Sequence, residues 1–135
     1  MRSLFICIAF ALTCSGSALA DTNIASDSAV DHSKPENVLD AVFTAARTSN
    51  PKLLNGLCDP KGEGDGDTKA LCELHLEHSR WAEFKRYFEK GVRISAVPRF
   101  RGDRAVLNFL FGPDGKKPEE MNLIRRNERW YLLSF

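Results

Sequence analysis

The sequence predicts an α+β domain in which N-terminal helices pack on a curved antiparallel sheet of about four strands. Apolar residues recur at helical spacing between residues 35 and 90, and from residue 92 onward they alternate with polar ones. Helices come first and strands follow through short connections, an order that favours an antiparallel meander. We expect a single domain over residues 33–135 of the 135-residue chain.

Residues 1–20 have the pattern of a secretory signal peptide. Arg2 supplies the positive charge, an apolar run follows, and Ala18-Leu19-Ala20 forms a cleavage site, with cleavage after Ala20. The apolar run is shorter than the about 20 residues that span a bilayer. Lipid attachment at Cys14 and an uncleaved anchor are the alternatives. The prediction is therefore an exported protein, periplasmic or secreted, with no membrane span and a disordered tether over residues 21–32.

Cys58 and Cys72 are the cysteines that remain after cleavage, because Cys7 and Cys14 lie within the signal peptide. An even pair in an oxidising compartment predicts a structural disulfide. The spacing differs from Cys-x-x-Cys, which disfavours a redox pair. In the chain-entropy model, a disulfide that closes a loop of this size stabilises the fold by about 3 kcal/mol.

The helical region is predicted in three parts. Ser33 and Glu36 have the spacing of a capping box before a first helix, and Pro51 ends that helix and opens a short second one. The glycine-rich acidic loop 59–67 lacks calcium ligands at the required EF-hand positions, so we expect a solvated loop. A long third helix is predicted over residues 68–90.

Strands are predicted over residues 92–100, 104–111, 120–126 and 129–135, separated by turn sequences such as Gly112-Pro113-Asp114-Gly115 and Asn127-Glu128. Their middle positions hold no Asp or His, and Tyr131 is the single tyrosine there. A general acid or base therefore has few candidates, and no catalytic residue is predicted.

Three side-chain groups remain as candidate sites, each with a structural alternative. The cluster Glu73, His75, Glu77 and His78 offers too few convergent ligands for a metal, so no metal site is predicted. The arginines of the sheet either line an anion site or form a solvated outer face: Arg99, Arg101, Arg104, Arg125, Arg126 and Arg129. The aromatic side chains of the third helix either pack in the core or form a ligand cage: Trp81, Phe84, Tyr87 and Phe88.

This order of elements, closing on Asn127-Glu128-Arg129-Trp130-Tyr131-Leu132, resembles the nuclear transport factor 2-like superfamily, also called SnoaL-like or cystatin-like. The opening helix at Val38-Leu39-Asp40-Ala41-Val42-Phe43 is similar too. The resemblance covers residues 33–135 and implies a cone whose cup can hold a small molecule. It also implies that homodimerisation through the outer face of the sheet is available. Many members have a short strand between the second and third helices, where this chain has the loop and the cysteine pair.

The function expected from these observations is an exported, non-catalytic binding domain. Its partner is either a small apolar ligand in the cup or a protein on the sheet, and no residue is assigned to ligand binding. The alternative is a small enzyme, of isomerase or hydrolase type, that uses the cup. Without Arg2 the net charge of +1 falls to zero, which gives no electrostatic case for nucleic acid. No cofactor is predicted.

Overall fold

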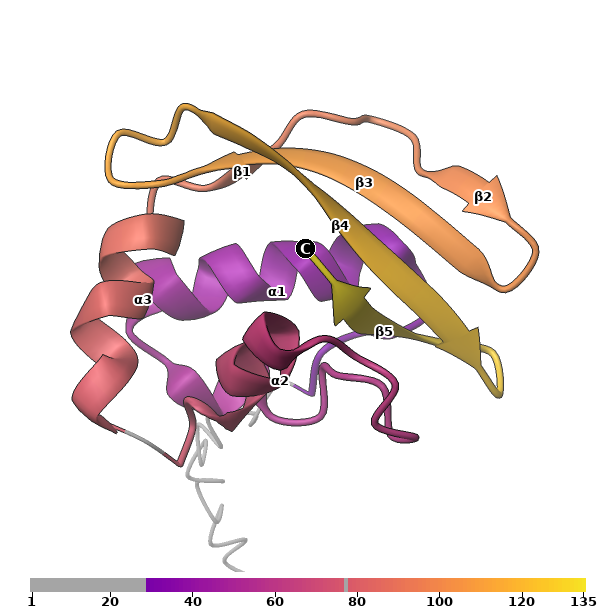
Figure 1. Cartoon of the computed structure of the whole chain (residues 1–135), viewed down its shortest axis with the longest axis horizontal. Coiled ribbons are helices and arrows are strands. Elements are labelled where there is room, and N and C mark those ends of the chain that lie inside the picture. The colour runs from indigo at the N-terminus through magenta and orange to yellow at the C-terminus, as the bar shows by residue number, and fades with distance from the viewer. Residues whose placement is uncertain (1–28, 77) are drawn as a thin grey trace, which may run out of the picture.

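The computed structural model describes residues 29–76 and 78–135. The predicted signal peptide, residues 1–20, and most of the predicted tether lie outside this range. Helices and strands form two layers, and the helices lie beneath the arch of the sheet (Figure 1). The α+β prediction is confirmed. The helical elements are α1 (Pro35–Thr48), η1 (Pro51–Leu54), α2 (Gly66–Glu73), η2 (His78–Arg80) and α3 (Trp81–Phe88).

The sheet is antiparallel and open, with five strands in place of the four predicted. Strand order is β1-β3-β4-β5, and β2 also pairs with β3. Both short strands therefore lie along the same edge of β3. The strands are β1 (Val92–Arg93), β2 (Arg99–Arg101), β3 (Arg104–Phe111), β4 (Lys117–Arg126) and β5 (Arg129–Ser134).

The predicted strand over residues 92–100 is broken because its backbone leaves the ladder after β1. The N–H groups of Ile94 and Ser95 both donate to the carbonyl of Asn108, at 2.9 and 3.3 Å. Two residues therefore oppose one, which is the geometry of a bulge. Pro98 follows and has no N–H to donate to a ladder. Pairing resumes at Arg99, opposite Val106.

The predicted long helix over residues 68–90 is also wrong, since α2 ends at Glu73 and α3 begins at Trp81. In a continuous helix the carbonyl of Cys72 would accept from the N–H of Leu76. Instead, Nδ1 of His75 lies 2.6 Å from that carbonyl, and the Leu76 N–H donates to Glu73. A straight helix of this length would span about 34 Å. The break lets both segments pack on one core.

The core lies between α1 and the concave face of the sheet. The buried face of α1 packs there together with alternate residues of β3, β4 and β5. Gly91 allows the chain to turn from α3 into β1 at close range, because a Cβ at this position would collide with the ring of Phe43. The largest fully buried side chains include Leu39, Phe43, Leu54, Leu57, Leu107, Phe109, Met121, Leu123 and Leu132.

The start of the domain differs from the sequence prediction. Lys34 is the N-cap of α1 without a side-chain cap, and Pro35 begins the helix, so the predicted capping box at Ser33 is wrong. The Ser33 N–H donates to Asp31 instead, at 2.9 Å. His32, the last residue of the predicted tether, is buried. The ordered domain therefore begins before residue 33. Within the ranges described, no helix has the length and apolar character needed to cross a membrane.

Candidate interaction surfaces

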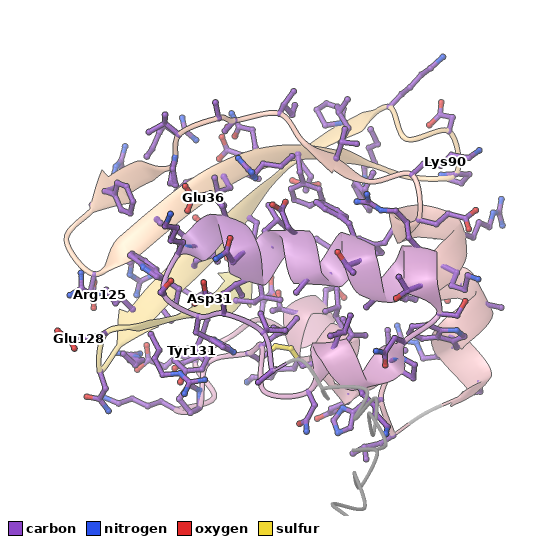
Figure 2. All side chains as sticks on the ribbon, turned by 180° about the vertical axis from the view of Figure 1, so that it is seen from behind. Asp31, Glu36, Lys90, Arg125, Glu128 and Tyr131 are labelled. Carbon is purple, nitrogen blue, oxygen red and sulfur yellow. A yellow bond between two sulfur atoms is a disulfide. The ribbon has the colours of Figure 1, made fainter. Side chains whose placement is uncertain are left out.

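The β5 edge of the sheet is covered by segments distant in sequence. The Trp130 N–H donates to the carbonyl of His32 at 2.9 Å, and Nδ1 of His32 lies 2.6 Å from the Trp130 carbonyl. Further along, the Leu132 N–H donates to Leu57 at 2.7 Å. Figure 2 shows Asp31 beside the hairpin that carries Arg125, Glu128 and Tyr131. The backbone groups on this side of β5 are thus largely satisfied, and strand addition here is blocked.

The glycine-rich loop continues this cover through its backbone, while most of its residues are exposed, as predicted. Cys58 forms a parallel bridge with Leu132, and the N–H groups of Asp59 and Asp65 donate to the carbonyls of Leu132 and Leu133. Asp65 also caps α2, since its carboxylate accepts from the Thr68 N–H at 2.8 Å. The predicted Cys58–Cys72 disulfide is confirmed. It joins the segment beside β5 to α2.

Asp59 is the buried acid of this loop, and its carboxylate is fully engaged. It accepts from the N–H groups of Lys61 and Glu63 and from the guanidinium of Arg126, 3.2 Å away. Burial by itself would raise the pKa of Asp59, but the hydrogen bonds from Arg126 and the two backbone groups together lower it. The same ion pair raises the pKa of Arg126, which also contacts Glu63 at 2.8 Å.

The outer face of the sheet is buried only beside β5. Leu123 and Leu132 point into the core, so Ile124 and Leu133 point to the outer face, yet both are buried. Arg126 lies two residues beyond Ile124 and therefore on the same face. Its contacts with Asp59 and Glu63 hold the loop over that part of the sheet.

At the opposite edge, around β1 and β2, apolar side chains are exposed to solvent. Val92 is 47% exposed, Ile94 54%, Val97 73% and Phe100 57%. Val92 pairs with Leu110, a half-buried residue of the outer face. Phe100 lies on the other face, with its ring 5.7 Å from that of Trp130. Among the described residues, these account for four of the five large hydrophobic residues that are exposed. Exposed apolar side chains that gather on one face are typical of an interaction site, so Val92 beside Leu110 marks the candidate surface.

The arginines predicted as a possible anion site are divided by the structure. Arg126 is held by Asp59, and Arg99 by Glu120 at 2.5 Å. Arg101 pairs across the hairpin with Arg104, and both are exposed. Neither forms an ion pair with any described residue. Because Ala105 points inward, Arg104 and its partner Arg101 point to the outer face. The outer face therefore has a basic end.

The remaining candidates have structural roles or no shared geometry. His75 holds the end of α2, Glu77 lies outside the described residues, and no group of three metal-ligating side chains occurs in the parts of the chain that the structure describes. Phe84 and Phe88 are buried in the core, with Trp81 and Tyr87 packed against it. Sequence reasoning missed His32 and the Asp59–Arg126 pair, because partners 98 and 67 residues away leave no local pattern.

The concave face, where the resemblance implies a cup, is filled by side chains. Leu107 and Phe109 of β3 are fully buried, and the Phe109 ring lies 5.8 Å from that of Phe43 on α1. The titratable residues buried in the described chain are His32 and Asp59, and both are bound to structural partners. No protein-family model matches this chain, and neither a curated protein nor a solved structure matches it.

Proposed function

We propose that this protein is an exported, non-catalytic binding domain that docks a protein partner on the outer face of its sheet. The observation that carries the proposal is an apolar strip along β1 and β3, in which exposed Val92 and Ile94 lie beside half-buried Leu110. The helices pack on the other face (Figure 1), so no described helix covers this strip. The fold that we propose is the nuclear transport factor 2-like cone, and the bridge at Cys58 stands where many members have a short strand.

Charge selects the kind of partner. Arg101 and Arg104 lie on the same face at the other end of β3, and neither forms an ion pair with a described acid. In a two-fold dimer the same patch meets itself, so these arginines would tend to repel one another. A partner with apolar and acidic residues satisfies both parts of the surface. We therefore favour such a protein over a second copy of this chain.

The short strands favour docking of side chains over strand addition. β1 has two residues and β2 has three, and a bulge separates them. Short, bent edges are poor templates for an added strand. A small enzyme that uses the cup is less well supported, because the inward residues of β3 and β5 are apolar. An apolar ligand in the cup would have to displace Leu107 or Phe109.

A displayed peptide library tests this function directly. We expect selected peptides to combine Asp or Glu with branched or aromatic residues, and to shift the amide signals of residues 92–110 in a nuclear magnetic resonance titration. Ile94→Lys and Arg101→Glu should each abolish most of the binding. Thr44→Lys, on the exposed side of α1, is the matched control and should bind normally. Selection of basic peptides, or concentration-dependent dimerisation that Ile94→Lys abolishes, would contradict the proposed partner.

A further inference from the structure

A second concave site lies away from the outer face, between α2 and α3. It is a pocket of about 210 Å³ whose lining comes from these two helices, Arg80 of η2, and Phe135. This is smaller than the roughly 300–1,000 Å³ of sites for drug-sized molecules. It borders the filled space between α1 and the sheet, because Phe135 in its wall also packs on Phe109. It lies where the chain breaks between α2, which ends at Glu73, and α3, which begins at Trp81.

The deep part of the pocket is apolar and partly aromatic. Leu71 of α2 and Leu74, which follows the end of α2, are buried and line it on one side, and Phe84 and Phe88 of α3 line it on the other. The two phenylalanine rings lie 5.0 Å apart and Phe135 meets Phe88 edge-on, so the wall is held by packing. A compact apolar group entering this space would bury its surface without reorganising the core.

Charged side chains line the exposed part of the same pocket. Asp67 comes from the first turn of α2, and Arg80 and Glu83 come from the region where α3 begins. All three are exposed, so they form the rim. Two carboxylates against one guanidinium leave the rim negative. Aromatic rings also attract cations through their faces, and Tyr87 lines the pocket as well.

From this arrangement we infer that the pocket binds a small apolar amine, with its hydrocarbon part among the phenylalanines and its ammonium group at Asp67 and Glu83. A neutral molecule of the same shape gains only the apolar contacts. A carboxylate gains them too, but it meets a rim of its own sign. The expected order of affinity is therefore amine, then alcohol, then acid.

Three probes of similar shape test this order: phenethylamine, 2-phenylethanol and phenylacetate, each titrated into the oxidised protein and followed through amide signals. We expect phenethylamine to shift the signals of residues 67–74 and 80–88 and to bind more tightly than 2-phenylethanol. The preference should be up to about fivefold for each carboxylate, as for exposed ion pairs. Equal or tighter binding of phenylacetate would overturn the inference, as would the absence of shifts in these two helices with all three probes.

Two variants locate the binding. Ala70 lines the pocket and is half-exposed, so Ala70→Phe should fill the space and abolish binding of phenethylamine. Ala82→Phe, on the solvent side of α3, is its matched control. The double variant Asp67→Asn with Glu83→Gln keeps the packing and should bind phenethylamine no better than 2-phenylethanol. If it retains the full preference, the rim does not select the amine. Failure here leaves the outer-face proposal intact, because the two sites share no residue.

Discussion

The two edges of the sheet are built in opposite ways. Along β5, the backbone is bonded to His32, Leu57, Asp59 and Asp65, and a disulfide holds one of these segments in place. Along β1 and β2, the edge is short, bent and carries exposed valine, isoleucine and phenylalanine side chains. Because one sheet has both a covered edge and an exposed edge, the exposed edge is not simply a consequence of the small size of the domain. The described part of the chain covers one edge and leaves the other exposed.

Removing the disulfide should have the largest effect on the covered edge. We expect Cys58→Ser with Cys72→Ser to lower the free energy of unfolding by about 3 kcal/mol, because the unfolded chain gains the entropy of an open loop. Denaturant titration with and without reductant measures this. Reductant should destabilise the parent protein and leave the double variant unchanged. A difference below about 1 kcal/mol would mean that the hydrogen bonds to β5 hold the segment around Cys58 in place without the disulfide.

Asp59→Asn should destabilise the protein by about 2 kcal/mol at pH 7, because it removes a buried charge-assisted pair while Arg126 keeps Glu63 as a partner. Glu63→Gln is the control. Because Glu63 is half exposed, this substitution should lower the free energy of unfolding by less than about 1 kcal/mol.

The pH dependence of stability gives an independent readout for Asp59. Its folded pKa is lowered, so its contribution is present above the unfolded pKa of about 3.9 and is lost as pH falls through the folded pKa. The parent should therefore lose stability below about pH 4. Asp59→Asn should lack that part of the loss. Parallel pH curves for the two proteins would show that Asp59 does not titrate as the ion pair requires.

His32→Phe tests the N-terminal part of the covered edge. The substitution keeps a ring beside Tyr131 and removes the bond from Nδ1 to Trp130, so we expect a loss of about 1 kcal/mol. The backbone bond from Trp130 to residue 32 remains. Faster hydrogen exchange at Trp130, with other amides of β5 unchanged, would locate the effect. Unchanged stability would mean that packing alone places this residue.

The open edge should show the smallest change in stability. Ile94→Lys and Val97→Lys are expected to stay within about 0.5 kcal/mol of the parent, as exposed substitutions usually do. Thermal unfolding of both variants measures this, and Leu107→Lys in the core provides the contrast. A loss above 1 kcal/mol would show that the exposed side chains contribute to the fold, and would weaken their assignment to binding.

Local patterns predicted the parts of the fold that depend on local contacts. The alternation in residues 104–111 predicted β3, and the turn sequence Asn127-Glu128 predicted the last hairpin. The disulfide was predicted from an even pair of cysteines in an expected oxidising compartment. At the break after Glu73 the ring of His75 contacts the Cys72 carbonyl, and at the split of the first strand two N–H groups share the Asn108 carbonyl. Neither the break nor the bulge alters the spacing of apolar residues in the sequence, so the spacing could not predict them. The interaction surface was hidden for the same reason, since alternation alone does not tell which face remains uncovered.

The contact between His32 and Trp130 joins residues 98 positions apart in the sequence. A native contact of such long range closes a long loop, and the conformational entropy lost in closing that loop slows folding. The last strand thus closes the sheet by meeting both the beginning and the middle of the domain. Until residues 129–134 are free to move into place, the chain lacks its covered edge.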